Sequence, residues 1–363
     1  MPDHVPAHAN VARLFDFVGH HAENRSTESD LRGNHANYRV GFFLDCGHAL
    51  QYKCFRVPSA VRDTKQSPSA ILSSMPRRLA DKATITLIGA GNLAQALGPA
   101  LKAAGYKIDL VAARETASSR RRAAMLAGLL EARTQSLNNA GPHSDILWIC
   151  HTDDALAETA RLLACKPGWT GKIVFHSSGA LTSDVLAPLK RRGSHTASLH
   201  PMMTFVPGAT PRMDEVPFAV EGDSRAVAVA RRIVGDLGAE IFLIKKAAKP
   251  LYHALGSFSS PMIVATLVTA ERVGRGAGLT ASQTRRVMAP ILRQTLKNYQ
   301  ERGAAAAFSG PIKRGDLNTV LRHLKELKRV PGASEVYRAL VKSALMDLPS
   351  AKRKELMRLL RKP

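Results

Sequence analysis

Lys249 and His253 have the residue types and the spacing to handle a proton together. They lie four residues apart in the chain, which places both side chains on one face of a helix. A lysine can donate a proton or stabilise a developing oxyanion, and a nearby histidine can serve as its partner. We predict both as catalytic residues. The alternative is that Lys249 caps the helix at the surface and that His253 is a hydrogen-bonded histidine of the core.

A glycine-rich turn has the pattern that holds a dinucleotide. The pattern G-x-G-x-x-A starts at Gly89, follows a predicted strand over 84–88 and opens a predicted helix over 92–104. Its first glycine permits the tight turn, its second lets a pyrophosphate approach the backbone, and the alanine lets the helix pack closely on the strand. The helix N-terminus presents free N–H groups to the phosphates. The alternative is a glycine turn that holds no ligand. The predicted cofactor-binding residues of this turn are Gly89, Gly91, Asn92, Leu93 and Ala94.

The end of the second predicted strand selects the dinucleotide. NAD-binding proteins usually place an acidic residue there, about 20 residues after the glycines, to hold the ribose 2′-hydroxyl. Here the strand over 107–113 is followed by Arg114, which can pair with a 2′-phosphate, and Ser118 can add a hydrogen bond. We therefore predict NADP as the cofactor. The alternative is that Arg114 is a surface arginine and that Glu115 takes the acidic role.

Polar residues also follow later predicted strands. Ser177 and Ser178 come after a strand over 172–176, and ligands of α/β proteins bind at the carboxyl ends of the strands. We predict Ser178 as a catalytic residue that hydrogen-bonds the substrate or the nicotinamide, with a structural turn as the alternative. His200 either lines the same cleft or caps a strand. Asp153, after a strand over 145–150, is predicted to contact the cofactor.

The elements that position these residues change character along the chain. Strands and helices alternate from Ala83 onward, which predicts an α/β fold: a doubly wound Rossmann domain with a parallel sheet. After Lys245 the sequence indicates helices alone, over 249–276, 280–302, 317–329 and 333–347. We predict a mostly disordered extension over 1–80, the Rossmann domain over 81–245, an all-helical domain over 246–348 and a basic tail over 349–363.

Three later segments carry a family resemblance: a serine-glycine motif in 175–181, a His-Pro motif in 198–205 and a Gly-Pro-x-x-Arg-Gly-Asp motif in 309–316. Over about residues 83 to 330 the chain resembles bacterial Rossmann-like proteins whose C-terminal half is a domain of unknown function. That family is similar to pyrroline-5-carboxylate reductase, ketopantoate reductase and the β-hydroxyacid dehydrogenases. The chain departs from the family pattern at His151-Thr152, where the family often has Val-Pro, and at Ser260, where it usually has asparagine.

The resemblance implies a helical C-terminal domain of the 6-phosphogluconate dehydrogenase type, which usually dimerises and closes the cleft over the nicotinamide. Related dehydrogenases place a catalytic lysine on the helix that holds Lys249. We expect an NADP-dependent oxidoreductase that transfers a hydride between NADPH and a small oxo- or imino-acid, working as a homodimer on an anionic substrate. The alternative is a regulatory or sensor protein that binds NADP without turnover.

The composition of the chain argues against other classes of function. The net charge of +23 fits a nucleic-acid partner, but aromatic residues are only 5% and no helix-turn-helix pattern accompanies the charge, so we expect no nucleic acid. The four cysteines form no C-x-x-C pair, and Cys46, His48 and Cys54 lack a fourth ligand, so we expect no metal site and a cytoplasmic protein. The most apolar stretch, 261–270, is shorter than the roughly 20 residues that cross a bilayer, so we expect no membrane contact.

Overall fold

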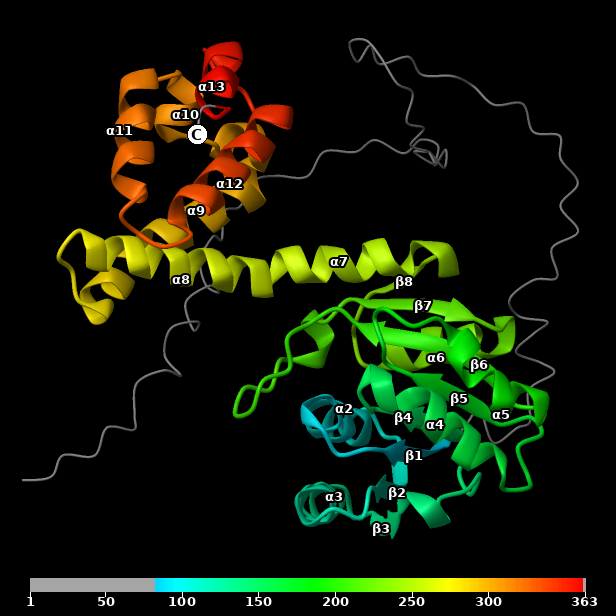
Figure 1. Cartoon of the computed structure of the whole chain (residues 1–363). Coiled ribbons are helices and arrows are strands. Elements are labelled where there is room, and N and C mark those ends of the chain that lie inside the picture. Colours follow the sequence, from blue (N-terminus) through cyan, green and yellow to red (C-terminus); the bar gives the residue numbers. More distant parts are fainter. Residues whose placement is uncertain (1–81, 362–363) are drawn as a thin grey trace, which may run out of the picture. The chain divides into compact units, whose positions relative to one another are not determined.

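The computed structural model describes residues 82–361. The predicted extension over 1–80 lies outside the described residues. The described chain begins with an eight-stranded sheet in the order β3-β2-β1-β4-β5-β6-β7-β8 (Figure 1). The strands are β1 Thr84–Ile88, β2 Lys107–Ala113, β3 Arg133–Ser136, β4 Ile146–Ile149, β5 Ile173–His176, β6 His195–Pro201, β7 Phe218–Gly222 and β8 Ile241–Leu243.

Strand direction follows the connections. The six strands from β3 to β6 run parallel, as the alternation of strands and helices predicts. β7 runs antiparallel to β6 and then pairs in parallel with β8. Residues 202–217, which join β6 to β7, contain no α-helix, whereas the crossover between two parallel strands usually runs through one. The sheet is therefore of the Rossmann type with an antiparallel step at one side.

Two apolar layers cover the two faces of the sheet. The first packs α2 (Asn92–Ala103), α3 (Ala117–Leu130) and α6 (Ser224–Asp236) against one face. The second packs α4 (Asp153–Ala164) and α5 (Ala187–Arg191) against the other. Strands buried on both sides read as continuous apolar runs, which is why most of the strands could be predicted. The polar strand β3 and the helix α6 were not predicted.

The rest of the described chain is helical, as predicted. Its helices are α7 Lys249–Ser259, α8 Pro261–Gly276, α9 Ala281–Ala307, α10 Gly310–Arg314, α11 Leu317–Leu327, α12 Ala333–Asp347 and α13 Arg353–Leu359. The sequence predicts one helix over 249–276, but it is interrupted at Ser260, whose φ of −136° and ψ of −79° are not helical. Pro261 lacks the backbone N–H that a continuous helix needs at this point.

The predicted basic tail over 349–363 contains the helix α13, in agreement with the basic amphipathic pattern of its sequence. Leu356 of α13 is fully buried and Leu360 nearly so. They pack with Val320, Val341 and Leu345 in a small separate core. The described part of this segment is therefore packed against the helical domain, which corrects the expectation of a solvated helix or a frayed tail.

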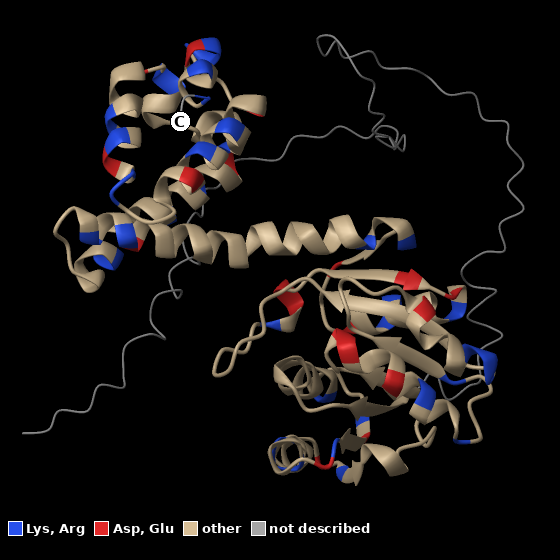
Figure 2. Ribbon diagram, viewed as in Figure 1, with Lys and Arg blue, Asp and Glu red and all other residues tan. Residues whose placement is uncertain are grey.

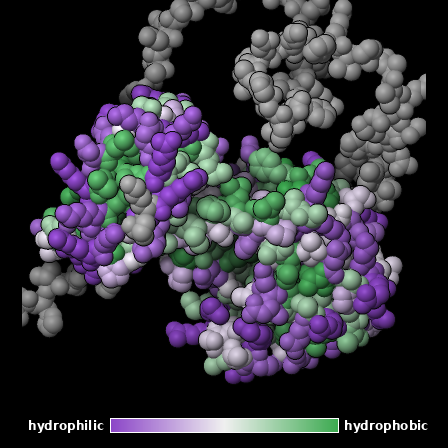
Figure 3. All heavy atoms as spheres, turned by 45° about the horizontal axis from the view of Figure 1, so that its top comes forward, coloured by the Kyte–Doolittle hydropathy of each residue, from purple (hydrophilic) through white to green (hydrophobic). Residues whose placement is uncertain are grey.

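The α7–α8 segment is apolar and open. By length and composition alone, Lys246–Gly276 is long and apolar enough to cross a membrane. The apolar segment is therefore longer than the stretch 261–270 that was expected to be too short to cross a bilayer. Figure 2 shows that most of α7 and α8 carries no lysine, arginine or carboxylate. Lys249 and Thr269 are the buried residues of these two helices, and green hydrophobic residues are open on the surface in Figure 3. Such an exposed apolar surface marks an interaction site.

Candidate functional site

The glycine turn has the conformation that its sequence predicts. Gly89 follows β1 with a φ of +99°, a left-handed value that glycine adopts at low cost, and its N–H donates to the carbonyl of Ala112 at 2.7 Å. Gly91 is the N-cap of α2. A side chain at Gly91 would meet its nearest atom, the carbonyl oxygen of Cys150, only at 3.9 Å. The backbone here is therefore open to a ligand, and the first N–H groups of α2 face the same opening.

A cavity of about 170 Å³ lies beside this turn. Three predicted cofactor residues, Gly89, Gly91 and Arg114, line it. Sequence reasoning missed four polar lining residues, Ser119, Arg122, His151 and Thr152. The complete lining is Gly89, Ala90, Gly91, Ala113, Arg114, Ser119, Arg122, Cys150, His151, Thr152 and Ala155.

The other predicted cofactor residues lie outside this lining. The Asn92 side chain donates to the carbonyl oxygen of Phe205 at 3.0 Å and so fixes the segment after β6. Leu93 packs against the core and Ala94 is fully buried, which fits the close helix–strand contact predicted for the alanine. Ser118 is exposed. Asp153 begins α4 and adds a negative charge to its first turn.

The cavity is electropositive at the end of β2. Arg114 and Arg122 both line it, and its lining residues include no aspartate or glutamate. Glu115, the acidic alternative, is instead paired with Arg120 at 3.4 Å on the exposed surface. Ser119 is held in place because its N–H donates to the side chain of Thr116, the N-cap of α3. Arg122 could have been found from its place on the first turns of the helix after Arg114.

Lys249 is a fully buried cation. Its Nζ donates to the Ser178 carbonyl oxygen at 2.9 Å and to the Ser198 Oγ, and Oε1 of Glu221 lies 4.0 Å away. Burial lowers the pKa of Lys249 to about 8, while the negative charges of Glu221 and Asp153 oppose that shift. The lysine therefore ties the first turn of α7 to β6, β7 and the turn after β5, and in this arrangement its Nζ reaches no open space.

Ser178 shapes the turn after β5. It is buried, and its Oγ accepts hydrogen bonds from the N–H groups of Ala180 and Leu181 at 3.2 and 2.8 Å. Its own N–H donates to Nδ1 of His176 at 3.1 Å. Burial, followed by the charge of Lys249, lowers the pKa of His176 to about 3. These contacts agree with the alternative in which Ser178 stabilises a structural turn. Its hydroxyl oxygen already accepts two hydrogen bonds from the protein backbone.

His253 joins a group that the sequence only partly revealed. His200 Nδ1 and the Tyr252 hydroxyl are 3.0 Å apart, and the rings of His200 and His253 are 6.1 Å apart between centroids. A Cβ at Gly179 would lie 2.4 Å from the His253 ring and 2.8 Å from the His200 ring. Glycine is therefore required where both rings crowd the turn after β5.

This group can hold and move a proton without a permanent charge on His200. Burial, with the charges of Lys249 and His253, lowers the pKa of His200 to about 4. Burial raises the pKa of Tyr252 to about 12. At neutral pH a neutral imidazole and a protonated phenol therefore share a hydrogen bond. Tyr252 could have been found because it lies between Lys249 and His253, three residues after Lys249. The predicted catalytic pair was instead chosen for its four-residue spacing.

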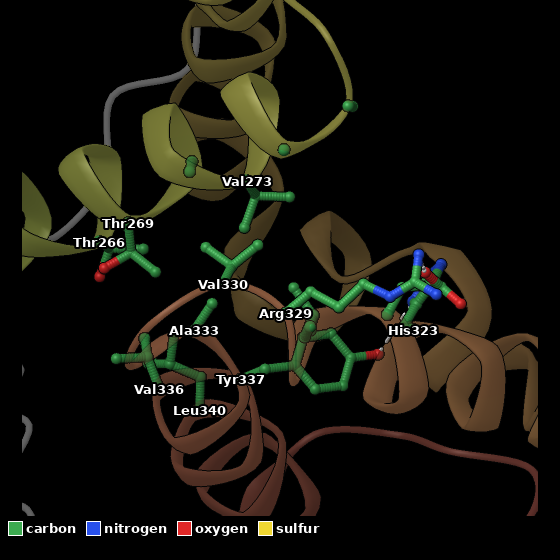
Figure 4. A pocket seen from close by; sticks show the side chains of 15 residues that line it. Thr266, Thr269, Val273, His323, Arg329, Val330, Ala333, Val336, Tyr337 and Leu340 are labelled. Atoms are coloured by element: carbon green, nitrogen blue, oxygen red, sulfur yellow. Dashed lines mark hydrogen bonds and ion pairs between the residues drawn. The ribbon is translucent and has the colours of Figure 1, made fainter.

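A second cavity, of about 800 Å³, lies among α8, α11 and α12 (Figure 4). Its walls are mostly aliphatic, and Val273, Val330 and Leu340 project into it in the close view. At one side the hydroxyl of Tyr337 is 3.2 Å from Nδ1 of His323. This cavity shares no residue with the glycine turn or with the group around Gly179.

Two protein families match the chain, one in its first part and one in its second. Residues 73–201 match a family described as a Rossmann-like domain. Residues 216–344 match a family described as a domain of unknown function, DUF2520. The chain therefore carries a Rossmann-like domain followed by this domain of unknown function, in agreement with the resemblance that the sequence motifs indicate. No curated protein matches the chain.

Three solved structures have the same fold. A protein of Bacteroides fragilis, provisionally described as an NADP oxidoreductase, is 25% identical, with a TM-score of 0.61 over 72% of this chain and 98% of that one. An imine reductase from Myxococcus stipitatus in complex with NADP+ is 18% identical, with a TM-score of 0.51 over 72% of this chain and 94% of that one. A pyrroline-5-carboxylate reductase from Coxiella burnetii is 15% identical, with a TM-score of 0.50 over 78% of this chain and 100% of that one.

Proposed function

We propose that the protein is an NADP-dependent oxidoreductase that transfers a hydride between NADPH and the C=O or C=N group of a small oxo- or imino-acid. One observation carries the proposal. The cavity at the glycine turn follows β1, β2 and β4, and the group around Gly179 follows β5 and β6, so both lie at the carboxyl ends of neighbouring parallel strands. Dinucleotides and their substrates meet at this edge of a Rossmann sheet. The names of the structural neighbours support the same reaction class.

The charges at the cavity favour NADP over NAD. Arg114 and Arg122 line the end near β2, where the adenosine ribose lies in this fold. Two guanidinium groups can hold a 2′-phosphate through paired hydrogen bonds. Glu115, which would suit a 2′-hydroxyl, is engaged with Arg120.

Tyr252 and His253 are the groups we assign to proton transfer. NADPH, when bound, supplies the hydride. The oxygen or nitrogen that receives negative charge then needs a proton, and a neutral phenol or a protonated imidazole can donate it. Tyr252 is oriented by His200, and His253 is exposed at the same turn. Lys249 and Ser178 act as positioning residues, because their polar atoms hold α7 and the turn after β5 in place.

The decisive experiment combines cofactor binding with turnover. We expect NADPH to bind more tightly than NADH by fluorescence titration, and a screen of oxo- and imino-acids to find a substrate that consumes NADPH. Tyr252→Phe and His253→Ala should each lower kcat by about 10²-fold or more while leaving the Kd for NADPH unchanged. Tyr337→Phe is a matched control, because this tyrosine pairs with a histidine in the separate cavity, and it should leave kcat unchanged.

The same experiment separates the proposal from its alternative. Tight NADPH binding without consumption of NADPH by any oxo- or imino-acid would favour a sensor that binds the dinucleotide without turnover. A full kcat in both the Tyr252 and the His253 variants would refute the assignment of proton transfer to these residues. Absence of NADPH binding by the wild-type protein would refute both functions.

We also propose that the apolar surface of α7, α8 and α9 is covered by a second copy of this chain. Lys249 anchors the start of α7 to the sheet, and Gly274 of α8 packs tightly against Thr284 of α9. Protein contacts at both ends of the α7–α8 segment favour a contact with a second copy of the chain over insertion into a bilayer. The exposed large apolar residues of this surface are Leu251, Leu255, Phe258, Met262, Ile263, Val264, Val268, Val287, Ile291, Leu292, Leu296 and Tyr299.

The oligomeric state tests this surface. Light scattering after size-exclusion chromatography should give the mass of a dimer for the wild-type protein. Phe258→Asp, at a side chain that is 72% exposed, should give a folded monomer. A monomeric wild-type protein, or one that binds neutral lipid vesicles through Phe258, would refute the dimer.

A further inference from the structure

His151 occupies an unusual place at the glycine turn. It lies two residues after the end of β4. Its ring lies over Gly89, because a Cβ at Gly89 would be 2.7 Å from Cδ2 and 3.2 Å from Nε2 of His151. His151 also lines the cavity beside the turn. The imidazole thus presents its Cδ2–Nε2 edge to the glycine turn at Gly89.

Thr159 determines which ring nitrogen carries the proton. Nδ1 of His151 and Oγ1 of Thr159 are 2.8 Å apart, and Thr159 is only 3% exposed. Within residues 82–361, His151 is the hydrogen-bond partner found for this hydroxyl. We take the hydroxyl as the donor and Nδ1 as the acceptor, because an unprotonated ring nitrogen accepts a hydroxyl hydrogen in the neutral imidazole. Nε2 therefore carries the N–H of the neutral ring.

The ring is neutral for two further reasons. Burial lowers the pKa of His151 to about 4, and the charge of Arg114 adds to that effect. A neutral ring with an accepting Nδ1 has one donor, and that donor is directed away from Thr159 toward the glycine turn. The site thus offers a fixed N–H in addition to the backbone N–H groups at the start of α2.

We propose that His151 donates its Nε2–H to an anionic oxygen of the dinucleotide pyrophosphate, and that Thr159 positions it by holding the tautomer. The inference rests on the proposed dinucleotide binding and deepens it. It assigns this chain a pyrophosphate ligand that an aliphatic residue at the same position could not provide. It also separates two subsites: His151 for the pyrophosphate, and Arg114 with Arg122 for the adenosine end.

Two ligands and three variants test the proposal. NADPH contains the pyrophosphate, whereas adenosine 2′-monophosphate contains the 2′-phosphate but no 5′-phosphate. His151→Leu should weaken NADPH about 10- to 100-fold, the range for loss of one hydrogen bond to a charged group, and leave adenosine 2′-monophosphate unchanged. His151→Gln keeps an N–H near the position of Nε2 and should recover most of the NADPH affinity. Thr159→Val, which touches no ligand, should weaken NADPH several-fold because the tautomer is no longer fixed.

A separate readout follows the ring itself. Nitrogen NMR of the ligand-free full chain should show a protonated Nε2 and an unprotonated Nδ1 at His151, and Thr159→Val should mix the two tautomers. A merely structural His151 would lower the melting temperature in His151→Leu without a change in Kd, which would overturn the proposal. Equal weakening of NADPH and adenosine 2′-monophosphate would overturn it as well. If the wild-type chain binds adenosine 2′-monophosphate but not NADPH, or binds neither, the proposed function fails together with this inference.

Discussion

The buried charge of Lys249 should make the stability of the protein depend on pH in an unusual direction. Its pKa in the folded protein is about 8, below the ordinary value of 10.5. Between these two pH values the unfolded chain binds a proton that the folded chain has released, so the free energy of unfolding must rise with pH. Because each pKa unit corresponds to about 1.4 kcal/mol, the whole rise from this lysine is about 3 kcal/mol. Below pH 8 the folded protein carries the full cost of the buried charge.

The measurement is a difference between two proteins. Urea unfolding from pH 7.5 to 10.5 gives the free energy of unfolding of the wild type and of Lys249→Met, and other titrating groups cancel in the comparison. The wild type should gain about 3 kcal/mol relative to the variant across this window. Lys245→Met, at an exposed lysine four residues earlier, is the control and should show no such difference. Parallel curves for the wild type and Lys249→Met would refute a depressed pKa for Lys249.

Three further predictions concern the cofactor cavity and the helical core. Arg114→Ser and Arg122→Ser should each weaken NADPH about 10-fold and change the Kd for NADH less than about 2-fold; equal losses for both cofactors would contradict the 2′-phosphate assignment. Gly89→Ala should lower the melting temperature by about 5 °C and prevent NADPH binding, since φ is +99° and the new methyl would press on His151. Leu356→Ala should cost about 2–3 kcal/mol in urea unfolding, whereas a loose tail would lose nothing.

Much of the fold could be predicted because its signals are local. The apolar runs around β1, β4 and β5 and the glycine pattern after β1 depend on neighbouring residues in the chain. β3 was not predicted because its residues, Arg133–Ser136, are polar. Its position in the sheet is set by pairing with β2, a distant segment of the chain. A strand at β7 is predicted by its apolar residues, but its antiparallel direction could not be inferred. Strand direction depends on the route of the connection and does not affect the composition of the strand.

The candidate site was harder because its members meet only after folding. Lys249 and His253 share a helix, as predicted, but the sheet buries the first and leaves the second exposed. Burial is a property of the neighbours, so no spacing rule could separate their roles. The hydrogen bond between His200 and Tyr252 joins residues 52 positions apart.

The interruption at Ser260 places a mechanical boundary inside what the sequence presents as one helix. α7 is fastened to the sheet through Lys249, and the backbone leaves the helical conformation at Ser260, between α7 and α8. Tyr252 and His253 therefore lie on the helix that is bound to the nucleotide-binding half, although the family boundaries assign them to the other half. A recombinant fragment that ends at Ser259 would retain every residue to which we assign cofactor binding or proton transfer, and would lack α8 and α9, two of the three helices that we assign to assembly.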